Sequence, residues 1–377
     1  MRVLIASHID TAAGGAELAL LELLVGLREH STEVRPEVVV PAKGPQFRRL
    51  QELGFPTRVV WQPWWAVWPS ESYGQRASRA LEIARAVGPM LELIRESKPD
   101  LVVTNSIVAP QAAIAAARAG VPHVWQVQEF GDRDHGLAFL LGKRASYSLV
   151  RRLSRIVVVP SGAVAAAVGC SATREVRYAV AGEWDSAPWV TAPYASPPPV
   201  LVLAGHKKAS KGQADAVEAL GRLAVRQIRP QLWLVGGGDT DYEQQLRARA
   251  VALGVLDQLT LMPPTTNLAK MYAQAGVALM CSRNEALGRV TVEAMKAGLP
   301  VVGLDAGATS SLLAEGRGLL YRHGAVDTLA DHVQRLLTAP EEAGRMAARA
   351  QAWSRSAFSA KAYAEHTSAV WAAAAAS

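Results

Sequence analysis

The sequence predicts two α/β domains, each built on a parallel β-sheet that helices cover on both faces. The chain has 377 residues, enough for two domains of ordinary size. Half of the residues are hydrophobic and 19% are charged, which excludes a largely disordered chain. Short β-branched runs alternate with longer Ala- and Leu-rich helical stretches from end to end. This alternation is typical of parallel sheets whose strands are joined by helices.

The elements of the first domain follow from this alternation. We expect buried strands at residues 2–6, 35–40, 57–61, 100–104, 122–127 and 155–159. Helical patterns lie between them, near residues 16–29, 75–96, 108–119 and 136–153. Because most of these strands contain a continuous apolar run, both of their faces should be buried under helices.

The alternation restarts in the second half of the chain after a break. Strands are predicted near residues 199–204, 231–235, 258–262, 276–281 and 300–304. Helices are predicted near residues 211–225, 241–254, 267–274 and 289–298. The break, residues 183–200, carries five prolines and no helical or strand period, and is interpreted as a stiff connector.

These patterns predict an N-terminal domain at residues 1–185 and a C-terminal domain at residues 186–352. Residues 353–377 predict a C-terminal helix that contains Phe358, Tyr363 and Trp371. This helix is expected either to close the second domain or to cross back onto the first.

The composition of the chain limits the compartments and the classes of partner that we expect for it. The formal net charge of +7 favours an anionic partner, but the basic residues are dispersed, which argues against nucleic acid. Cys170 and Cys281 cannot form a disulfide framework, residues 1–10 lack a signal-peptide core, and no stretch has the apolar length of a membrane span. We expect a cytoplasmic protein, either free or peripheral on the inner face of the membrane.

Two loops at predicted strand ends have the composition of anion sites. Gly14 and Gly15 precede a predicted helix, where free N–H groups could meet a phosphate, although such a pair is equally often only a turn. The second loop follows the strand at 199–204 and reads GHKKASKGQ, with four potentially cationic side chains: His206, Lys207, Lys208 and Lys211. These residues predict neutralisation of a diphosphate, with a solvated surface loop as the alternative.

The strongest signal is the stretch CSRNEALGRVTVEAMKAGLPVVG. Glu285 precedes a glycine turn, and Glu293 lies two turns into the predicted helix. The amides of Leu287, Gly288 and Arg289 would point out of the helix start between the two carboxylates. This arrangement suits a ligand with hydroxyl groups at both ends and a diphosphate in the middle.

This stretch resembles the retaining glycosyltransferases of family 4 (glycosyltransferase group 1), which have the GT-B architecture. The likeness spans nearly the whole chain and includes the Gly14–Gly15 loop, the Lys211–Gly212 pair and LVGGG at Leu234–Gly238. It implies two Rossmann-like domains whose parallel sheets face a central cleft, in which a nucleotide-diphosphate sugar is bound.

The resemblance also implies roles for individual residues. Glu293 would hold the ribose hydroxyls and Glu285 the hydroxyls of the donor sugar, while Lys211 and the helix-start amides would hold the diphosphate. The implied donor-binding set is Gly14, Gly15, Gly205, Lys207, Lys211, Gly236, Met262, Pro263, Glu285, Ala286, Leu287, Gly288, Arg289, Val290 and Glu293. Met262 and Pro263 mark the expected place of the base.

The chain departs from the family pattern in three places. Gly205-His206-Lys207 replaces the usual Gly-Arg, so that Lys207 is the predicted substitute for the phosphate-binding arginine. Gln128-Glu129 stands where many members have His-Glu, and a glutamine cannot act as a base. The run AGATSS replaces a Gly-Gly-x-x-Glu pattern after the last predicted strand.

The predicted reaction is sugar transfer to an acceptor hydroxyl, with retention of the anomeric configuration and without metal or cofactor, in carbohydrate biosynthesis. The candidate catalytic residues are Glu285, Lys211, Gln128 and Glu129. Lys211 and the helix start would stabilise the charge that develops on the leaving diphosphate. The acceptor is expected to contain a sugar or to be lipid-linked.

The run WQPWWAVWP at residues 61–69 holds four tryptophans, and its two prolines argue against a regular element. We expect several of these rings on an exposed loop that contacts the acceptor, through Trp64 and Trp65, or a membrane surface. A folded-over hydrophobic cap is the alternative.

Two other functions remain open from the sequence. One is a nucleotide-sugar epimerase with the same two-domain architecture, and the other is a non-catalytic nucleotide-sugar-binding protein. An NAD-dependent oxidoreductase is disfavoured because the chain lacks GxGxxG after its first strand.

Overall fold

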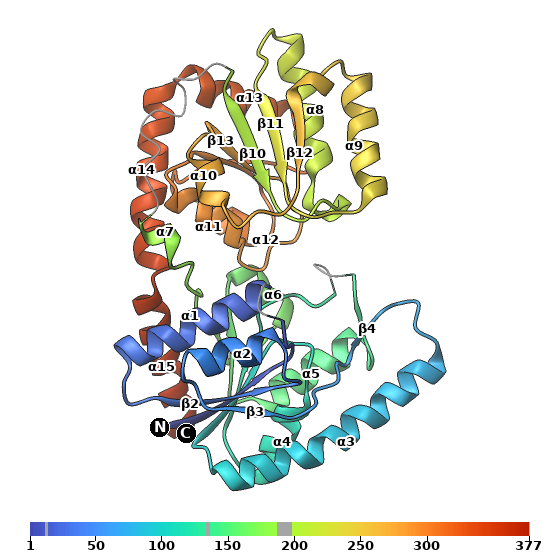
Figure 1. The fold of residues 1–377 in the computed structure, drawn as a ribbon, viewed down its shortest axis with the longest axis vertical. Coiled ribbons are helices and arrows are strands. Elements are labelled where there is room, and N and C mark those ends of the chain that lie inside the picture. The colour runs from blue at the N-terminus through green and yellow to red at the C-terminus, as the bar shows by residue number, and fades with distance from the viewer. Residues whose placement is uncertain (12–13, 133–135, 187–197, 377) are drawn as a thin grey trace. The chain divides into compact units, whose positions relative to one another are not determined.

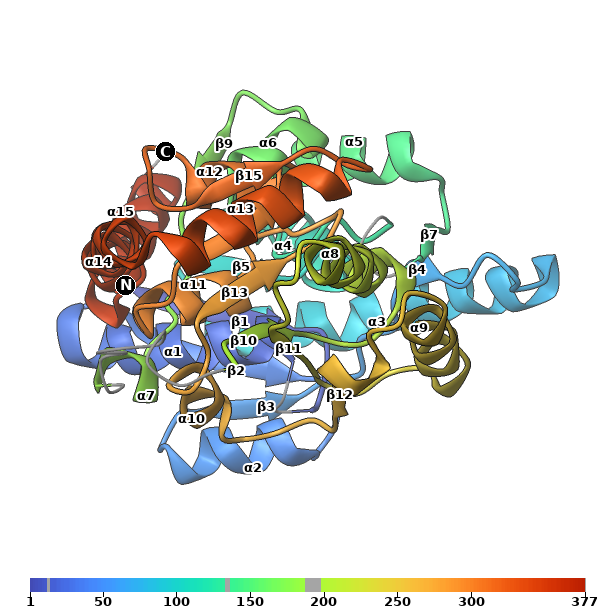
Figure 2. The same cartoon turned by 90° about the horizontal axis from the view of Figure 1, so that it is seen from above.

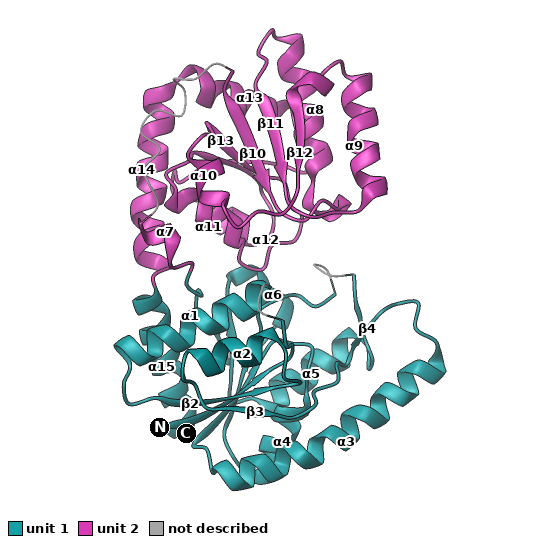
Figure 3. Cartoon of the chain, viewed as in Figure 1, with its two compact units in different colours: residues 1–179, 360–377 teal, residues 180–359 magenta. Residues whose placement is uncertain are grey.

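The computed structural model describes residues 1–11, 14–132, 136–186 and 198–376, and the chain forms two compact units (Figures 1 and 3). Unit 1 comprises residues 1–179 and 360–377, and unit 2 comprises residues 180–359. The first boundary lies a few residues before the predicted position, residue 185, and the second a few residues after residue 352.

Unit 1 is built on a seven-stranded parallel sheet with the order β3-β2-β1-β5-β6-β8-β9. The strand order reverses between β1 and β5, so that their carboxyl ends flank the topological switch point, where open sheets bind ligands. The strands are β1 (Arg2–Ser7), β2 (Arg35–Val40), β3 (Thr57–Val59), β5 (Leu101–Asn105), β6 (His123–Gln126), β8 (Ile156–Val159) and β9 (Thr173–Glu175).

The helices of unit 1 are α1 (Gly15–His30), α2 (Pro45–Glu52), α3 (Tyr73–Ser97), α4 (Gln111–Ala119), α5 (Lys143–Leu153), α6 (Gly162–Val168) and α15 (Ala360–Ala376). Buried residues of α3 and α4 share a core with Leu4 and Val102 of the sheet. A short antiparallel pair, β4 (Ala66–Val67) and β7 (Ala138–Phe139), lies outside the main sheet.

The C-terminal helix α15 packs against α1 and belongs to unit 1 (Figure 3). Gly26 of α1 allows a close approach, because a Cβ at this position would lie 2.7 Å from the carbonyl oxygen of Ala360. Gln126 Nε2 also donates to the hydroxyl of Tyr363 at 2.6 Å. Of the two placements expected for this helix, the structure has the one on the first domain.

Unit 2 repeats the design with a six-stranded parallel sheet of order β12-β11-β10-β13-β14-β15. Its switch point lies between β10 and β13. The strands are β10 (Val200–Ala204), β11 (Gln231–Val235), β12 (Leu259–Met262), β13 (Val277–Met280), β14 (Val301–Leu304) and β15 (Leu319–Tyr321).

The helices of unit 2 are α7 (Glu183–Ser186), α8 (Gln213–Val225), α9 (Thr240–Ala252), α10 (Leu268–Tyr272), α11 (Arg289–Lys296), α12 (Gly307–Leu313), α13 (Val326–Thr338) and α14 (Pro340–Ala357). In Figure 1, α8 and α9 run alongside β10, β11 and β12, and Figure 2 views both helices almost end-on. Buried side chains of α8, α9 and α13 share one hydrophobic core with these strands.

The first and last segments of unit 2 are joined by a buried lysine. The Nζ of Lys296, on α11, donates to the carbonyl oxygens of Val180 at 2.7 Å and Phe358 at 3.2 Å, and to Asp185 Oδ1 at 2.6 Å. The Lys296 side chain is fully buried, so these three acceptors replace the water that would otherwise surround its ammonium group. The lysine therefore holds the two ends of unit 2 together.

The structure differs from the predicted elements in several places, and it adds helices that were not predicted: α2, α6, α12, α13 and most of α14. The predicted strand at 57–61 ends at Val59, and the helix expected near 136–153 begins only at Lys143, after β7. Helix α7 occupies the start of the predicted connector, of which residues 187–197 lie outside the described part of the chain. Within the described residues, no helix is both long and apolar enough to cross a membrane.

Candidate functional site

The loops after β10 and β13 are joined at the switch point of unit 2. Arg283 N donates to the carbonyl oxygen of Ser210 at 3.1 Å, and Ser282 Oγ donates to the same oxygen at 3.5 Å. Gly212 has φ +70°, and a Cβ there would lie 2.1 Å from the Cys281 carbonyl oxygen. Only glycine allows this approach, and the approach brings two segments about 70 residues apart into one site.

Lys211 and Glu285 meet in this site. The Nζ of Lys211 lies 2.5 Å from Glu285 Oε1, and the two side chains are 27% and 11% exposed. The Glu285 backbone is held by α12, since Ala308 N donates to its carbonyl oxygen at 2.9 Å. The structure therefore brings together the two residues that the sequence predicts for the sugar and the diphosphate.

The second predicted carboxylate lies on α11, which begins at Arg289 after Gly288 in a left-handed conformation, φ +83°. Glu293 Oε1 is 3.1 Å from the Nε of Arg289, one turn back along the helix. Glu293 also lies near the Tyr272 hydroxyl, whose pKa is raised well above its usual value, first by burial and second by the Glu293 charge. The Tyr272 hydroxyl therefore stays protonated beside Glu293.

The remaining residues at the helix start are arranged as follows. Leu287 and Gly288 are buried, while Ala286 and Val290 are half-buried. Glu285 precedes α11, so Glu285 and Glu293 do not lie on one continuous helix.

Lys207 lies differently from the prediction. Its ammonium donates to the carbonyl oxygens of Gly236 and, at 2.8 Å, Met262, and lies 3.1 Å from Glu243 Oε1. The side chain is only 2% exposed. These partners use its three donors, so the prediction of Lys207 as the phosphate-binding cation is corrected: the residue links the ends of β11 and β12.

The glycines of these loops have packing roles. Gly236, φ +145°, would place a Cβ 2.2 Å from the carbonyl oxygen of Gly205, so the loops after β10 and β11 touch through their backbones. Pro263 is exposed and Met262 half-buried at the end of β12, the expected place of the base.

In unit 1, the first turn of α1 carries a buried acidic group, Glu17, that was not predicted from the sequence. Glu17 is buried, and a Cβ at Gly14 would lie 2.0 Å from its Oε2. Burial raises the pKa of Glu17, while hydrogen bonds from the backbone, including Gly14, lower it. Its Oε1 is 3.9 Å from His8 Nε2. The glycine at position 14 therefore makes room for Glu17, whereas Gly15 is exposed and has open space around its Cα.

Gln128 and Glu129 follow β6 and form hydrogen bonds with the end of β5 and the loop after it. Gln128 Nε2 donates to Asn105 Oδ1 at 3.0 Å, and Glu129 Oε1 accepts from Ser106 Oγ and, at 2.8 Å, from Ile107 N. Ser106 has φ +105°, a conformation that is strained for a residue with a side chain. Glu129 thus stabilises a strained turn at the switch point of unit 1.

The four tryptophans of residues 61–69 do not form one exposed loop. Trp61 and Trp68 are 60% and 59% exposed, Trp64 is half-buried, and Trp65 is 2% exposed. Trp65 stacks on Trp125 with ring centroids 5.7 Å apart, and its Nε1 donates to the Ile107 carbonyl oxygen at 2.6 Å. The prediction of an acceptor-contacting Trp65 is therefore wrong, because its ring belongs to the core. The segment also contains β4, which the two prolines argued against.

Trp64 lines a pocket at the carboxyl end of β1. Its Nε1 donates to the His8 carbonyl oxygen at 2.9 Å, and its ring lies 5.6 Å from the His8 ring. The pocket has a volume of about 250 Å³, and its lining includes Asp10, Trp61 and Arg79. Trp64 therefore lines a pocket that a ligand can reach, and its contact with an acceptor stays a prediction.

Neither cysteine is in a disulfide, and burial raises the pKa of Cys281 to about 12. No group of three or more His, Cys, Asp or Glu side chains within the described residues is arranged to hold a metal ion.

Solved structures define the class of this fold. The crystal structure of Anabaena Alr3699/HepE in complex with UDP superposes with a TM-score of 0.77 at 20% identity, over 99% of this chain and 100% of that chain. WaaG, a glycosyltransferase involved in lipopolysaccharide biosynthesis, superposes with a TM-score of 0.66 at 16% identity, over 98% and 99%. The fold is that of the GT-B glycosyltransferases, as the resemblance implied.

Sequence families carry the assignment further. Residues 193–353 match the family described as glycosyl transferases group 1, and residues 14–184 match the glycosyl transferase 4-like domain. The two matches cover both units, so that the chain combines a glycosyl transferase 4-like domain with a glycosyl transferases group 1 domain in a GT-B fold.

Curated relatives are similar over shorter regions. A D-inositol 3-phosphate glycosyltransferase of Jonesia denitrificans is 35% identical over 129 residues, which is 32% of this chain and 30% of that protein. A GDP-mannose-dependent alpha-(1-6)-phosphatidylinositol monomannoside mannosyltransferase of Mycobacterium tuberculosis is 33% identical over 165 residues, 41% and 42% of the two chains. The chain thus spans less than half of the length of these relatives.

Proposed function

We propose that this protein transfers a sugar from a nucleotide-diphosphate sugar to an acceptor hydroxyl, with retention of the anomeric configuration and without a metal ion. One observation carries this proposal. Lys211, Glu285 and the first turn of α11 lie together at the switch point of unit 2, with Glu293 farther along the same helix. A cation, helix-start amides and two carboxylates match the parts of such a donor.

Each group has a part of the donor to bind. The two oxygens of Glu293 accept hydrogen bonds from the vicinal hydroxyls of the ribose, and Glu285 accepts from hydroxyls of the sugar. The first-turn amides of α11 and the Lys211 ammonium bind the diphosphate. Of the glycines at the start of α1, Gly15 is the one with room for a phosphate.

The reaction breaks the bond between the anomeric carbon and the diphosphate oxygen, and forms a bond from the acceptor oxygen to that carbon. Negative charge grows on the leaving diphosphate, and Lys211 with the helix dipole stabilises it. Because these groups are part of the chain, the proposed reaction needs no divalent cation.

Retention is proposed to follow attack on the same face that the diphosphate leaves. The leaving phosphate can then take the proton of the acceptor hydroxyl, so that no side-chain base is needed. The contacts of Gln128 and Glu129 fit this route, because both side chains are engaged in hydrogen bonds with Asn105, Ser106 and Ile107. We assign them the positioning of the loop after β5 rather than a chemical step.

The acceptor is proposed to contain a sugar or another polyol, either free or lipid-linked. The names of the curated relatives include inositol phosphate and phosphatidylinositol monomannoside. Trp64 and its pocket on unit 1 supply the aromatic and polar contacts that such an acceptor uses.

Binding and turnover test the proposal separately. UDP or GDP at one hundred times its Kd should raise the free energy of unfolding by about 2.7 kcal/mol. Incubation with UDP-glucose or GDP-mannose and a panel of sugar and inositol acceptors should give a glycosylated product by mass spectrometry. Release of the nucleoside diphosphate without such a product would favour the epimerase, and binding without turnover would favour the binding protein.

Lys211 gives the sharpest test of the chemistry. Lys211→Ala should lower kcat/KM by about two orders of magnitude, the scale for losing one charge-stabilising group. Lys270→Ala, at an exposed position of α10, is the matched control and should leave kcat/KM unchanged. A loss below about threefold in Lys211→Ala would contradict its role at the leaving group.

A further inference from the structure

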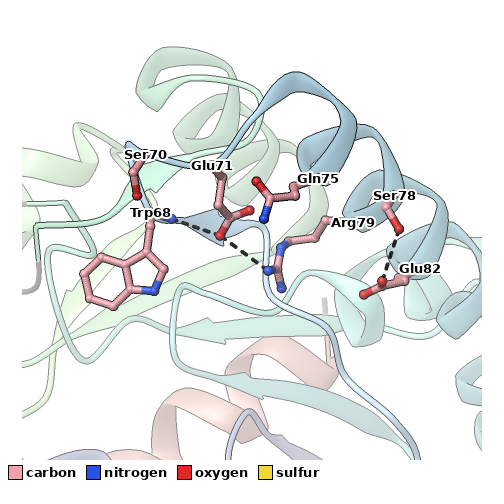
Figure 4. A pocket seen from close by; sticks show the side chains of 7 residues that line it. All are labelled: Trp68, Ser70, Glu71, Gln75, Ser78, Arg79 and Glu82. Atoms are coloured by element: carbon pink, nitrogen blue, oxygen red, sulfur yellow. Dashed lines mark hydrogen bonds and ion pairs between the residues drawn. The ribbon is translucent and has the colours of Figure 1, made fainter.

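Unit 1 has a second pocket, which shares Arg79 with the Trp64 pocket and is otherwise lined by residues that the proposed function does not involve. It lies between the segment after β4 and the first turns of α3, and has a volume of about 430 Å³ (Figure 4). Trp68 forms one side, and four polar residues of α3 form the other: Gln75, Ser78, Arg79 and Glu82.

The spacing of these residues places them on one face of α3. Gln75, Ser78, Arg79 and Glu82 follow one another at intervals of three, one and three residues, so that all four lie on one side of the helix. Figure 4 shows these polar side chains along the helix and the Trp68 ring across from them. An aromatic ring beside a row of donors and acceptors is the arrangement that binds a sugar, whose C–H face stacks on the ring while its hydroxyls form hydrogen bonds.

A hydrogen-bonded pair at the centre of the pocket has unused capacity. Glu71 Oε1 accepts from Trp68 N at 3.1 Å and from Arg79 Nη2 at 3.4 Å. Glu71 Oε2 and Arg79 Nε are enclosed and have no hydrogen-bond partner among the described residues. After a small rotation of these side chains toward the pocket, one ligand hydroxyl can donate to the carboxylate and accept from the guanidinium.

The charge of the pocket selects an uncharged ligand. Two carboxylates, Glu71 and Glu82, face one guanidinium, Arg79. The net negative charge repels phosphate, sulfate and the headgroups of anionic lipids. Hydroxyl groups, in contrast, can donate to both carboxylates.

Arg79 connects this pocket with the one that contains Trp64. Arg79 lines both pockets, and the lining of the Trp64 pocket also includes Asp10 and Trp61. We propose that the Trp68 pocket is a second saccharide subsite, which binds an uncharged sugar ring of an oligosaccharide acceptor next to the ring in the Trp64 pocket. The proposal rests on the proposed function for the identity of the acceptor, but the binding it states can be measured without a donor.

The test uses the full chain labelled with ¹⁵N at its tryptophan indoles. The Trp68 signal is assigned by its loss in Trp68→Phe, and is followed while maltotriose, α-1,6-mannotriose or chitotriose is added. We expect at least one trisaccharide to shift this signal and to bind more tightly than its monosaccharide. Trp68→Ala should weaken that binding about tenfold, as expected when an aromatic stacking face is lost. Glu71→Gln should weaken it too, because a charged acceptor is lost.

Tyr73→Ala is the matched control. Tyr73 begins α3, is 93% exposed and does not line the pocket, so its removal should leave saccharide binding unchanged. If no trisaccharide shifts the Trp68 signal, the proposal is overturned. Two other results would also overturn it. One is that anionic vesicles shift the Trp68 signal and the trisaccharides do not. The other is that Trp68→Ala and Tyr73→Ala lower co-sedimentation with vesicles equally, because the surface then binds a membrane.

Titration of the same proteins with UDP and GDP separates this proposal from the proposed function. Nucleotide binding without any saccharide binding would contradict the subsite and support the donor site. Saccharide binding at Trp68 without nucleotide binding would support the subsite and contradict the proposed transferase activity.

Discussion

Lys207 and Lys211 lie four residues apart in one loop and differ completely in their surroundings. Lys207 is buried and holds the backbone of Gly236 and Met262, whereas Lys211 is partly exposed and pairs with Glu285. The sequence places both cations after a strand, and only the folded loop distinguishes a structural lysine from one that is available to a ligand.

Lys207→Met should therefore destabilise the protein without removing the donor site. The carbonyl groups of Gly236 and Met262 lose their buried donor, at a cost of about 1–3 kcal/mol in the free energy of unfolding. Urea denaturation measures this loss, and calorimetry on the folded variant should show a change in nucleotide Kd below about threefold. If the variant is stable and binds nucleotide much more weakly, Lys207 binds the phosphate after all, and its structural role is contradicted.

Glu293→Ala should weaken the binding of a nucleotide donor. Loss of a charged acceptor for two ribose hydroxyls is expected to raise Kd about tenfold or more. Calorimetry with UDP and GDP measures this change. Glu341→Ala, whose side chain is 91% exposed, is the control. Equal affinities in the two variants would reject the ribose role.

At the scale of elements, the C-terminal helix is the clearest case in which long-range contacts decide a placement. Helix α15 lies more than 200 residues after β6, yet Tyr363 accepts a hydrogen bond from Gln126, and Arg155 Nη1 donates to the Ala374 carbonyl oxygen at 3.0 Å. The helix is therefore part of the fold of unit 1 and not an appendage of unit 2.

Tyr363→Phe should lower the free energy of unfolding of unit 1. The change leaves the buried amide of Gln126 without this acceptor, at a cost of about 1–3 kcal/mol. Denaturation monitored by tryptophan fluorescence measures the loss. Tyr73→Phe removes the hydroxyl of a 93% exposed ring and should have no effect; similar losses in both variants would contradict the role of α15.

Strand β6 carries a pH-dependent contribution to stability. His123 is buried, its Nε2 lies 2.8 Å from Thr104 Oγ1, and burial lowers the His123 pKa to about 3. Between its unfolded pKa, near 6.5, and about 3, only the unfolded chain binds this proton. Stability should therefore fall as the pH drops below about 6.5.

His123→Gln tests this contribution. The slope of unfolding free energy against pH between about pH 5 and 6 should be shallower in the variant, by at most about 1.4 kcal/mol per pH unit. Urea titrations at several pH values give both slopes. Parallel slopes would show that His123 does not titrate on unfolding.

At the scale of the whole molecule, the cationic groups of the proposed donor site belong to the chain itself. Lys211 and the start of α11 supply the positive charge that the leaving diphosphate requires. Glycosyl transfer should therefore persist in excess EDTA, assayed by product formation with UDP-glucose or GDP-mannose. Loss of activity with EDTA, restored by Mg²⁺ or Mn²⁺, would contradict the metal-independent mechanism.

The two-unit α/β architecture was predictable because its signals are local. Strands such as Arg35–Val40 and Gln231–Val235 are short apolar or β-branched runs between helical patterns, and the structure has both at the predicted bounds. The short strands β4, β7, β9 and β15 were missed, because two or three residues carry too little pattern to be recognised.

The features of the candidate site also fall into two groups, those that were predictable from the sequence and those that were not. By itself, the sequence determined the fold class and the loops after β10 and β13, because glycines and charged residues at strand ends are read from adjacent positions. Tertiary structure alone decided that Lys207 is buried, that Glu17 lies against Gly14, that Trp65 stacks on Trp125, and that α15 packs on α1. The physical reason is that burial and pairing depend mainly on partners far away in the chain, which the local pattern of a sequence does not reveal.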